Sequence, residues 1–290
     1  MNSRKILITG ITSIHGWPIF RIFREKMGVS KVFGIRSPKM KIPDGENIIA
    51  SCITDRQSLE KVKQTFSPTD IIHCAGVCDL DVCEERPHWA RELNTVGTKV
   101  VTDVFSDCHI TYLSSDLVFS GNNPPRGGYD ENAEVNPVSV AGKTIADAEK
   151  IISTCKSYCI VRLGLPIGAS ITGDKGAIDF IESRFKKSLP VTLFTDEFRS
   201  CIDCEDIRET VYKLILNKFQ GVFNLGGPAA VSLHNIGEWI LNKGGYDLSL
   251  LKGILRCEEV NGPPRIGNVS LNSSKICDLL GISLSAPIVL

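Results

Sequence analysis

Lys5-Ile6-Leu7-Ile8-Thr9 runs directly into Gly10-Ile11-Thr12-Ser13-Ile14-His15-Gly16. The first five residues predict a buried strand, and the pattern that follows the loop predicts a helix over residues 15–27. Glycines at such a strand-to-helix turn let backbone N–H groups approach a pyrophosphate, whose charge is favoured by the helix N-terminus. The alternative is a tight turn that binds no ligand. We expect this loop to bind a dinucleotide.

The rest of the first half repeats this alternation of short apolar runs and helical patterns. Helices are expected over residues 55–66, with Thr54 as the cap, 85–105 and 138–153, and strands over residues 32–35, 48–53, 70–74, 109–114 and 157–163. Continuously apolar strands separated by helices predict a parallel sheet that is covered on both faces. The predicted fold class is therefore α/β, with a Rossmann-type doubly wound parallel sheet.

After about residue 164 this regular alternation ends. Helices are expected over residues 177–187, 203–217, 233–243 and 273–280, and short strands over 191–194 and 222–225. We assign residues 1–163 to a dinucleotide-binding Rossmann domain and residues 164–290 to a smaller C-terminal α/β substrate lobe. No clear linker separates them, so one compact unit with a cleft between its lobes is expected.

Composition argues against several classes of protein. The 290 residues carry 33 basic and 33 acidic side chains, so no basic field exists to hold nucleic acid or an anionic membrane. No apolar run reaches the ~20 residues of a membrane helix, and the N-terminal sequence lacks the features of a signal peptide. A cytoplasmic protein is therefore expected. The eleven cysteines are odd in number and are expected to be reduced thiols, with no metal site.

The charges after the second predicted strand indicate which dinucleotide is bound. Residues 34–39 (GIRSPK) contain no acid that could bind the ribose 2′-hydroxyl of NAD. The guanidinium of Arg36 suits a 2′-phosphate instead. NADP is therefore expected in preference to NAD, the alternative being that these cations belong to a solvated loop.

Several motifs together resemble the extended short-chain dehydrogenase/reductases, most closely the dTDP-4-dehydrorhamnose reductases. Thr9-Gly10-x-x-Ser13-x-x-Gly16 is similar to T-G-x-x-G-x-x-G, residues 73–76 (HCAG) to N-A-A/A-G, and residues 114–121 (SSDLVFSG) to S-T-D-Y-V-F-D-G. Residues 198–200 (FRS) resemble a substrate-lobe segment. The resemblance implies a reductase of nucleotide sugars whose dinucleotide contacts fall on Gly10, Thr12, Ser13, Ile14, Gly16, Arg36, Cys74, Ala75 and Gly76.

The chain departs from this family at the residues that carry out the reaction. In the family, a Tyr-x-x-x-Lys pair protonates the substrate carbonyl and holds the nicotinamide ribose. The resemblance places Ala141 and Ile145 at these two positions, and no Tyr-x-x-x-Lys occurs anywhere in the chain. Ser115 is the only retained member of the catalytic set. Tyr129, in a loop expected to be flexible, is a weak substitute for the missing tyrosine.

Three other residues affect ligand binding in this interpretation. Ser13 replaces the middle glycine of the loop, where it either crowds the pyrophosphate or hydrogen-bonds it. Arg199 matches the family's arginine and is expected to bind an anionic group of the substrate, with Asp116 on the same substrate side. The alternative for Arg199 is a surface ion pair with Asp196 or Glu197.

Three functions remain open at this point. The first is an NAD(P)-binding family member whose reductase chemistry is lost or altered. The second is an active sugar-nucleotide or small-molecule oxidoreductase or epimerase that uses another proton donor, such as Tyr129, Asp116 or Cys78. The third is a non-catalytic regulatory or interaction subunit. The expected partners are a small-molecule or nucleotide-sugar ligand and either a second copy or a partner enzyme.

Overall fold

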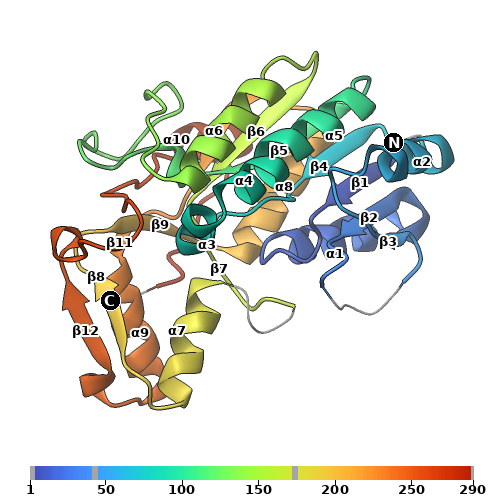
Figure 1. Ribbon diagram of the computed structural model, residues 1–290. Coiled ribbons are helices and arrows are strands. Elements are labelled where there is room, and N and C mark those ends of the chain that lie inside the picture. The colour runs from blue at the N-terminus through green and yellow to red at the C-terminus, as the bar shows by residue number, and fades with distance from the viewer. Residues whose placement is uncertain (1–3, 41–44, 172–175, 289–290) are drawn as a thin grey trace.

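The computed structural model describes residues 4–40, 45–171 and 176–288 (Figure 1). Its centre is a seven-stranded sheet in which every neighbouring pair is parallel. The strands follow one another across the sheet in the order β10 (Gly221–Leu225), β6 (Tyr158–Leu163), β5 (His109–Ser115), β4 (Asp70–His73), β1 (Ile6–Thr9), β2 (Val32–Arg36) and β3 (Ile48–Ala50). This is the doubly wound α/β architecture that the alternating pattern predicts.

Helices cover both faces of this sheet because successive strand residues point to opposite sides. Leu7 and Ile71 belong to a core shared with α2 (Arg56–Phe66), α5 (Thr98–Val104) and α6 (Val140–Ile152). Ile6, Ile8 and Ile72 belong to a core shared with α1 (Gly16–Met27), α8 (Cys204–Asn217) and α10 (Ser274–Leu280). Figure 1 shows α5 and α6 on one side of the sheet and α1 and α8 on the other.

A smaller lobe lies beside the carboxyl ends of the strands, at the lower left of Figure 1. It contains a three-stranded sheet in the order β11 (Ala230–Ser232), β9 (Phe198–Asp203) and β7 (Leu165–Ile167), and a parallel pair of β8 (Val191–Phe194) and β12 (Leu251–Ile254). Its helices α7 (Ala177–Lys186) and α9 (Leu233–Gly244) pack on each other and on β8. Short 3₁₀ turns complete the chain at η1 (Val29–Lys31), η3 (Asp116–Val118), η4 (Leu248–Leu250) and η5 (Arg256–Glu258).

Three local expectations were wrong. The strand over residues 222–225, expected in the smaller lobe, is β10 and lies at the edge of the main sheet beside β6. The helix expected over residues 85–105 is divided into α3 (Leu80–Glu85), α4 (Pro87–Arg91), the π-helix η2 (Glu92–Gly97) and α5, with Pro87 at the start of α4. The cap of α2 is Asp55 rather than Thr54, because the Asp55 carboxylate accepts from the backbone N–H of Ser58 at 3.1 Å.

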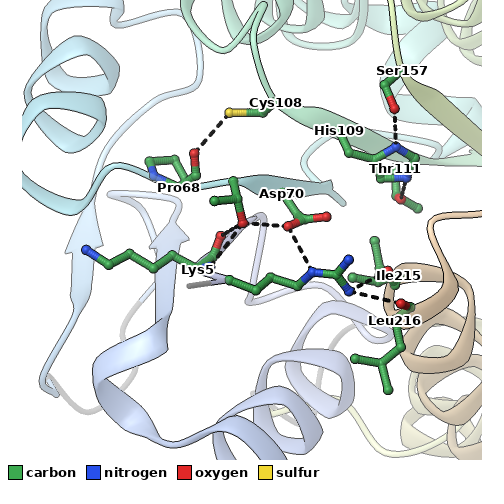
Figure 2. A network of polar contacts seen from close by, with 11 residues as sticks. Lys5, Pro68, Asp70, Cys108, His109, Thr111, Ser157, Ile215 and Leu216 are labelled. Atoms are coloured by element: carbon green, nitrogen blue, oxygen red, sulfur yellow. Dashed lines mark hydrogen bonds and ion pairs between the residues drawn. The ribbon is translucent and has the colours of Figure 1, made fainter. Parts of the chain in front are cut away.

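Polar groups close the amino-terminal edge of the main sheet (Figure 2). The guanidinium of Arg4 lies 3.5 Å from the buried Asp70 carboxylate and donates to the carbonyls of Ile215 and Leu216 at 2.9 and 3.2 Å. Thr69 donates its hydroxyl to Asp70 at 2.6 Å. These contacts join β1, β4 and the end of α8. Ligands of such sheets bind at the opposite edge, outside the carboxyl ends of the strands.

Candidate functional site

The glycine loop between β1 and α1 lies against the end of β4. Gly10 has φ +67°, and a Cβ placed on it would lie 2.6 Å from the Cα of Ala75. A Cβ on Gly16 would lie 2.4 Å from the carbonyl oxygen of Gly10. Both positions therefore require glycine. Thr12 is buried within the loop, and the Ile14 side chain lies beside Gly176 of the smaller lobe.

Ser13 takes part in the structure of the loop itself. Its Oγ accepts the backbone N–H of Gly16 at 3.0 Å, and its own N–H donates to the carbonyl of Gly10 at 3.0 Å. The hydroxyl oxygen is thus engaged by the first residue of α1. This geometry adds a third role, loop closure, to the two roles expected for this side chain.

Arg36 ends β2, next to the glycine loop, because the N–H of Ile11 donates to the carbonyl of Ile35 at 3.2 Å. Its guanidinium donates to the carbonyls of Met40 at 2.9 Å and Ser37 at 3.5 Å. The cation is therefore held over its own loop, at the strand end where the sequence predicts a 2′-phosphate.

The segment after β4 forms the other side of the candidate dinucleotide site. Cys74 is 7% exposed, and burial raises the pKa of its thiol, so it is a neutral packing residue. Ala75 is partly buried and Gly76 is exposed. The backbone at Gly76 is consequently open to a ligand that lies across the ends of β1 and β4.

Ser115 ends β5, and its hydroxyl is engaged by its neighbours. Its Oγ accepts the N–H of Leu117 at 3.2 Å and donates to the carboxylate of Asp116 at 3.1 Å. Asp116 is fully buried and receives two bonds from Arg199 on β9, from Nε at 2.6 Å and from Nη2 at 2.5 Å. Burial raises the pKa of Asp116, and the guanidinium of Arg199 opposes that shift.

The alternative given for Arg199, a surface ion pair, is wrong. It is 8% exposed, so it is not a surface arginine, and its partner is Asp116, the first residue of η3 after β5, rather than Asp196 or Glu197. Those two acids pair instead with Arg256 and Arg265. Arg199 therefore joins the smaller lobe to the end of β5, and two of its three guanidinium nitrogens are already bonded to a carboxylate.

Ala141 and Ile145, the positions that the resemblance assigns to the Tyr-x-x-x-Lys pair, lie in the apolar core. Ala141 is 0% exposed and Ile145 is 5% exposed, and both belong to the core on the α6 side of the sheet. The α6 helix starts at a Ser139 cap whose Oγ accepts the N–H of Gly142 at 3.1 Å. Neither position presents a proton donor or a cation.

Tyr129 does not lie in a flexible loop. It is 5% exposed, and its ring stacks on Phe119 with centroids 4.2 Å apart. Its backbone bonds to Ser270 and Asn272 at 2.8 Å each. Among the other proposed proton donors, Cys78 is exposed, and its thiol lies close enough to the Arg199 guanidinium to interact with it electrostatically.

Sequence reasoning missed a buried ion pair behind these residues. Arg162 on β6 bonds both carboxylate oxygens of Glu149 on α6, and Ser114 donates to the same carboxylate at 2.5 Å. The guanidinium also lies over the ring of Phe119, 5.2 Å from its centroid. The available signal was an arginine within the apolar run of residues 157–163, since a buried charge needs a partner.

His15 is the N-cap residue of α1. Both ring nitrogens are sealed from solvent, and neither has a hydrogen-bond partner among the described residues. Burial lowers the pKa of His15 from 6.5 to about 4. His73, at the end of β4, is also fully buried, with its pKa lowered to about 4 for the same reason.

The lowered pKa values of these two histidines predict that the free energy of unfolding falls as the pH is lowered. Between pH 6.5 and about 4 the unfolded chain binds protons that folded His15 and His73 do not. Each ring should therefore lower the free energy of unfolding by about 3 kcal/mol across this window. Urea unfolding at several pH values measures the slope. His15→Leu should reduce it, whereas the exposed His88→Leu should not. An unchanged slope in His15→Leu would contradict a neutral buried ring.

Three other features bear on the class of site. Each of the eleven cysteines is a free thiol. Within residues 4–40, 45–171 and 176–288, no three His, Cys, Asp or Glu side chains gather closely enough to hold a metal ion. Over the same part of the chain, no helix combines the length and apolar character needed to cross a membrane.

The sequence is similar to a protein family and to several known proteins. The family model described as the RmlD substrate binding domain matches residues 4–286. The β subunit of methionine adenosyltransferase 2 from Rattus norvegicus is 26% identical over 294 residues, covering 98% of this chain and 85% of the relative. A probable low-salt glycan biosynthesis reductase from Haloferax volcanii is 24% identical, covering 95% of this chain and 92% of the relative.

Solved structures share the fold over nearly the whole chain. A hypothetical dTDP-4-dehydrorhamnose reductase from Sulfolobus tokodaii has a TM-score of 0.82 at 22% identity, covering 97% of this chain and 96% of that one. The dTDP-4-dehydrorhamnose reductase of Bacillus anthracis, in complex with NADP, has a TM-score of 0.80 at 19% identity, covering 98% and 95%. A dTDP-glucose 4,6-dehydratase from Streptomyces venezuelae, with NAD bound, has a TM-score of 0.84 at 16% identity, covering 97% and 92%.

Proposed function

The chain belongs to the RmlD substrate binding domain family, and we propose that it binds NADP(H) without catalysing the reduction of a 4-keto sugar nucleotide. One observation carries the proposal. Ala141 and Ile145, which the resemblance places at the positions of the proton donor and the ribose-binding cation, are both part of the core. The parts of the site that face a dinucleotide keep the form that such a ligand needs.

The residues at the ends of β1, β2 and β4 fit a dinucleotide. Gly10 and Gly16 place no side chain at the two ends of the loop, and with Thr12, Ser13 and Ile14 they would hold the pyrophosphate at the start of α1. Arg36 would meet the 2′-phosphate, and Cys74, Ala75 and Gly76 would form the opposite wall. When bound, the nicotinamide would supply a hydride. Neighbouring folds solved with NADP or NAD support this choice of ligand.

The residues around the substrate side support the loss of ketone reduction. General acid catalysis needs a donor within hydrogen-bond reach of the carbonyl oxygen. The Ser115 hydroxyl donates to Asp116, and Asp116 is bonded to Arg199. Tyr129 is stacked within the core. The retained polar groups are therefore bonded to one another, and a substrate carbonyl would have to displace one of these bonds.

Cofactor choice gives the first test. NADPH should bind more tightly than NADH, and Arg36→Ala should weaken NADPH binding by about tenfold through the loss of a charged hydrogen bond. NADH binding should not change. Lys39→Ala, which removes an exposed cation from the same loop, is the matched control. Fluorescence titration of each protein with the two reduced dinucleotides measures the dissociation constants. Tighter binding of NADH, or an Arg36→Ala variant with the parent's NADPH affinity, would refute the preference.

A second candidate function is that of a non-catalytic subunit of another enzyme. It is favoured by the similarity, over 98% of this chain and 85% of each relative, to proteins from Xenopus laevis and Bos taurus described as the β subunit of methionine adenosyltransferase 2. In that case the dinucleotide would stabilise a binding surface rather than react. Size-exclusion chromatography of this chain with a methionine adenosyltransferase catalytic subunit, with and without NADPH, tests the idea. Separate elution under both conditions would count against it.

A further inference from the structure

His73 forms the centre of a buried hydrogen-bond chain at the end of β4. Its Nδ1 lies 2.7 Å from the hydroxyl oxygen of Thr9, the last residue of β1. Its Nε2 lies 3.0 Å from the hydroxyl oxygen of Thr98, the first residue of α5. The ring is 0% exposed, so both nitrogens depend on these two partners.

The direction of each hydrogen bond follows from the donors available. The Thr98 hydroxyl donates its single hydrogen to the carbonyl of Asn94 at 2.5 Å, so toward His73 it can only accept. Nε2 must therefore carry the ring proton, and Nδ1 accepts from the Thr9 hydroxyl. The Thr9 oxygen in turn accepts the backbone N–H of Ala75 at 3.3 Å. Every donor and acceptor in this hydrogen-bond chain has a partner only when the His73 ring is neutral and carries its proton on Nε2.

This hydrogen-bond chain reaches both walls of the candidate dinucleotide site. Through Thr9 it holds Gly10 and Ala75 in direct contact, where a Cβ on Gly10 would lie 2.6 Å from the Ala75 backbone. At its other end, the Asn94 side chain accepts from the N–H of Val77 and donates to the Val77 carbonyl, each at 2.8 Å. The exposed Gly76 lies between these two fixed points.

We propose that His73 is a positioning residue that fixes the spacing between the glycine loop and the Ala75–Val77 wall. The proposal rests on the proposed function, because the ligand whose binding depends on this spacing is the dinucleotide. A shift in either wall moves backbone groups that a rigid pyrophosphate and ribose must meet together. The loss of one bond of the chain should therefore weaken binding without touching any ligand atom.

Thr98→Val provides the test because valine has nearly the shape of threonine and lacks the hydroxyl. It removes the partner of His73 Nε2 and should weaken NADPH binding by about tenfold, the value of one buried hydrogen bond. Thr98→Ser keeps the hydroxyl and should restore the parent's affinity. The matched control is Thr102→Val on the same helix. Thr102 is similarly buried, and its hydroxyl donates to the carbonyl of Lys99 at 3.0 Å, outside the chain.

A second readout is independent of any ligand. Nitrogen-15 NMR of the ring should show a protonated Nε2 and a bare Nδ1 in the parent and in Thr102→Val, with a changed pattern in Thr98→Val. Equal NADPH affinities in Thr98→Val and Thr102→Val, or a parent ring protonated on Nδ1, would overturn the proposal. If the parent binds neither NADPH nor NADH, the proposed function fails, and the role of His73 in dinucleotide binding fails with it. If the parent binds and Thr98→Val is unaffected, only the positioning role fails.

Discussion

Replacing Arg199 with methionine should lower the free energy of unfolding by about 3–5 kcal/mol, because it leaves a buried carboxylate without its counter-charge. Asp116 is 0% exposed, and both of its oxygens accept from the Arg199 guanidinium. The pair joins the end of β5 in the main sheet to β9 in the smaller lobe. Its loss should therefore destabilise the contact between the lobes as well as the carboxylate.

Urea unfolding of three variants separates the contribution of the ion pair to stability from that of its surroundings. The double variant Asp116→Leu with Arg199→Met should recover most of the loss, since no uncompensated charge remains. Arg256→Met removes a more exposed arginine from its ion pair with Asp196 and should cost at most about 1 kcal/mol. An Arg199→Met variant as stable as Arg256→Met would show that the buried pair does not hold the lobes together.

Ile145→Lys should also be strongly destabilising, by about 3–5 kcal/mol, because it buries a cation without a counter-charge. Ile145 is 5% exposed and lies in the core shared by the sheet and α6. The resemblance assigns this position to a ribose-binding lysine. The expected loss therefore measures whether the position has become part of the core or still opens into a ligand site.

Ile145→Met is the control, because a volume-conserving apolar change usually costs less than about 1.5 kcal/mol. Thermal or urea unfolding in the absence of dinucleotide gives the comparison. If Ile145→Lys is as stable as Ile145→Met, the lysine side chain has found an open polar cleft. The interpretation of position 145 as core would then be wrong.

The regular elements could be predicted from sequence wherever a local pattern specifies them. Apolar runs such as residues 70–73 and 158–163 become buried parallel strands because both faces of the sheet are covered. Gly10 was identifiable for the same local reason, since the turn after β1 needs a positive φ. The strand over residues 222–225 was also identifiable, but its place beside β6 depends on chain geometry that no local pattern encodes.

The polar contacts of the site could not be predicted because they join residues far apart in sequence. Asp116 and Arg199 are 83 residues apart, and each was expected to face a ligand rather than the other. Tyr129 is buried because it stacks on Phe119 and its backbone pairs with residues near 271. His73 appeared only as part of a motif, although its two hydrogen bonds link β1 to α5.

The central claim is that the chain binds NADPH and does not use it to reduce a ketone. The most direct measurement follows NADPH absorbance in the unmodified protein with a 4-keto sugar nucleotide, at NADPH concentrations that a parallel fluorescence titration shows to be saturating. The account predicts a bound dinucleotide and a rate about 10²–10⁴-fold below that of a related reductase, the usual contribution of a placed general acid. Saturable binding accompanied by turnover at a reductase's rate would contradict it and would show that another residue supplies the proton.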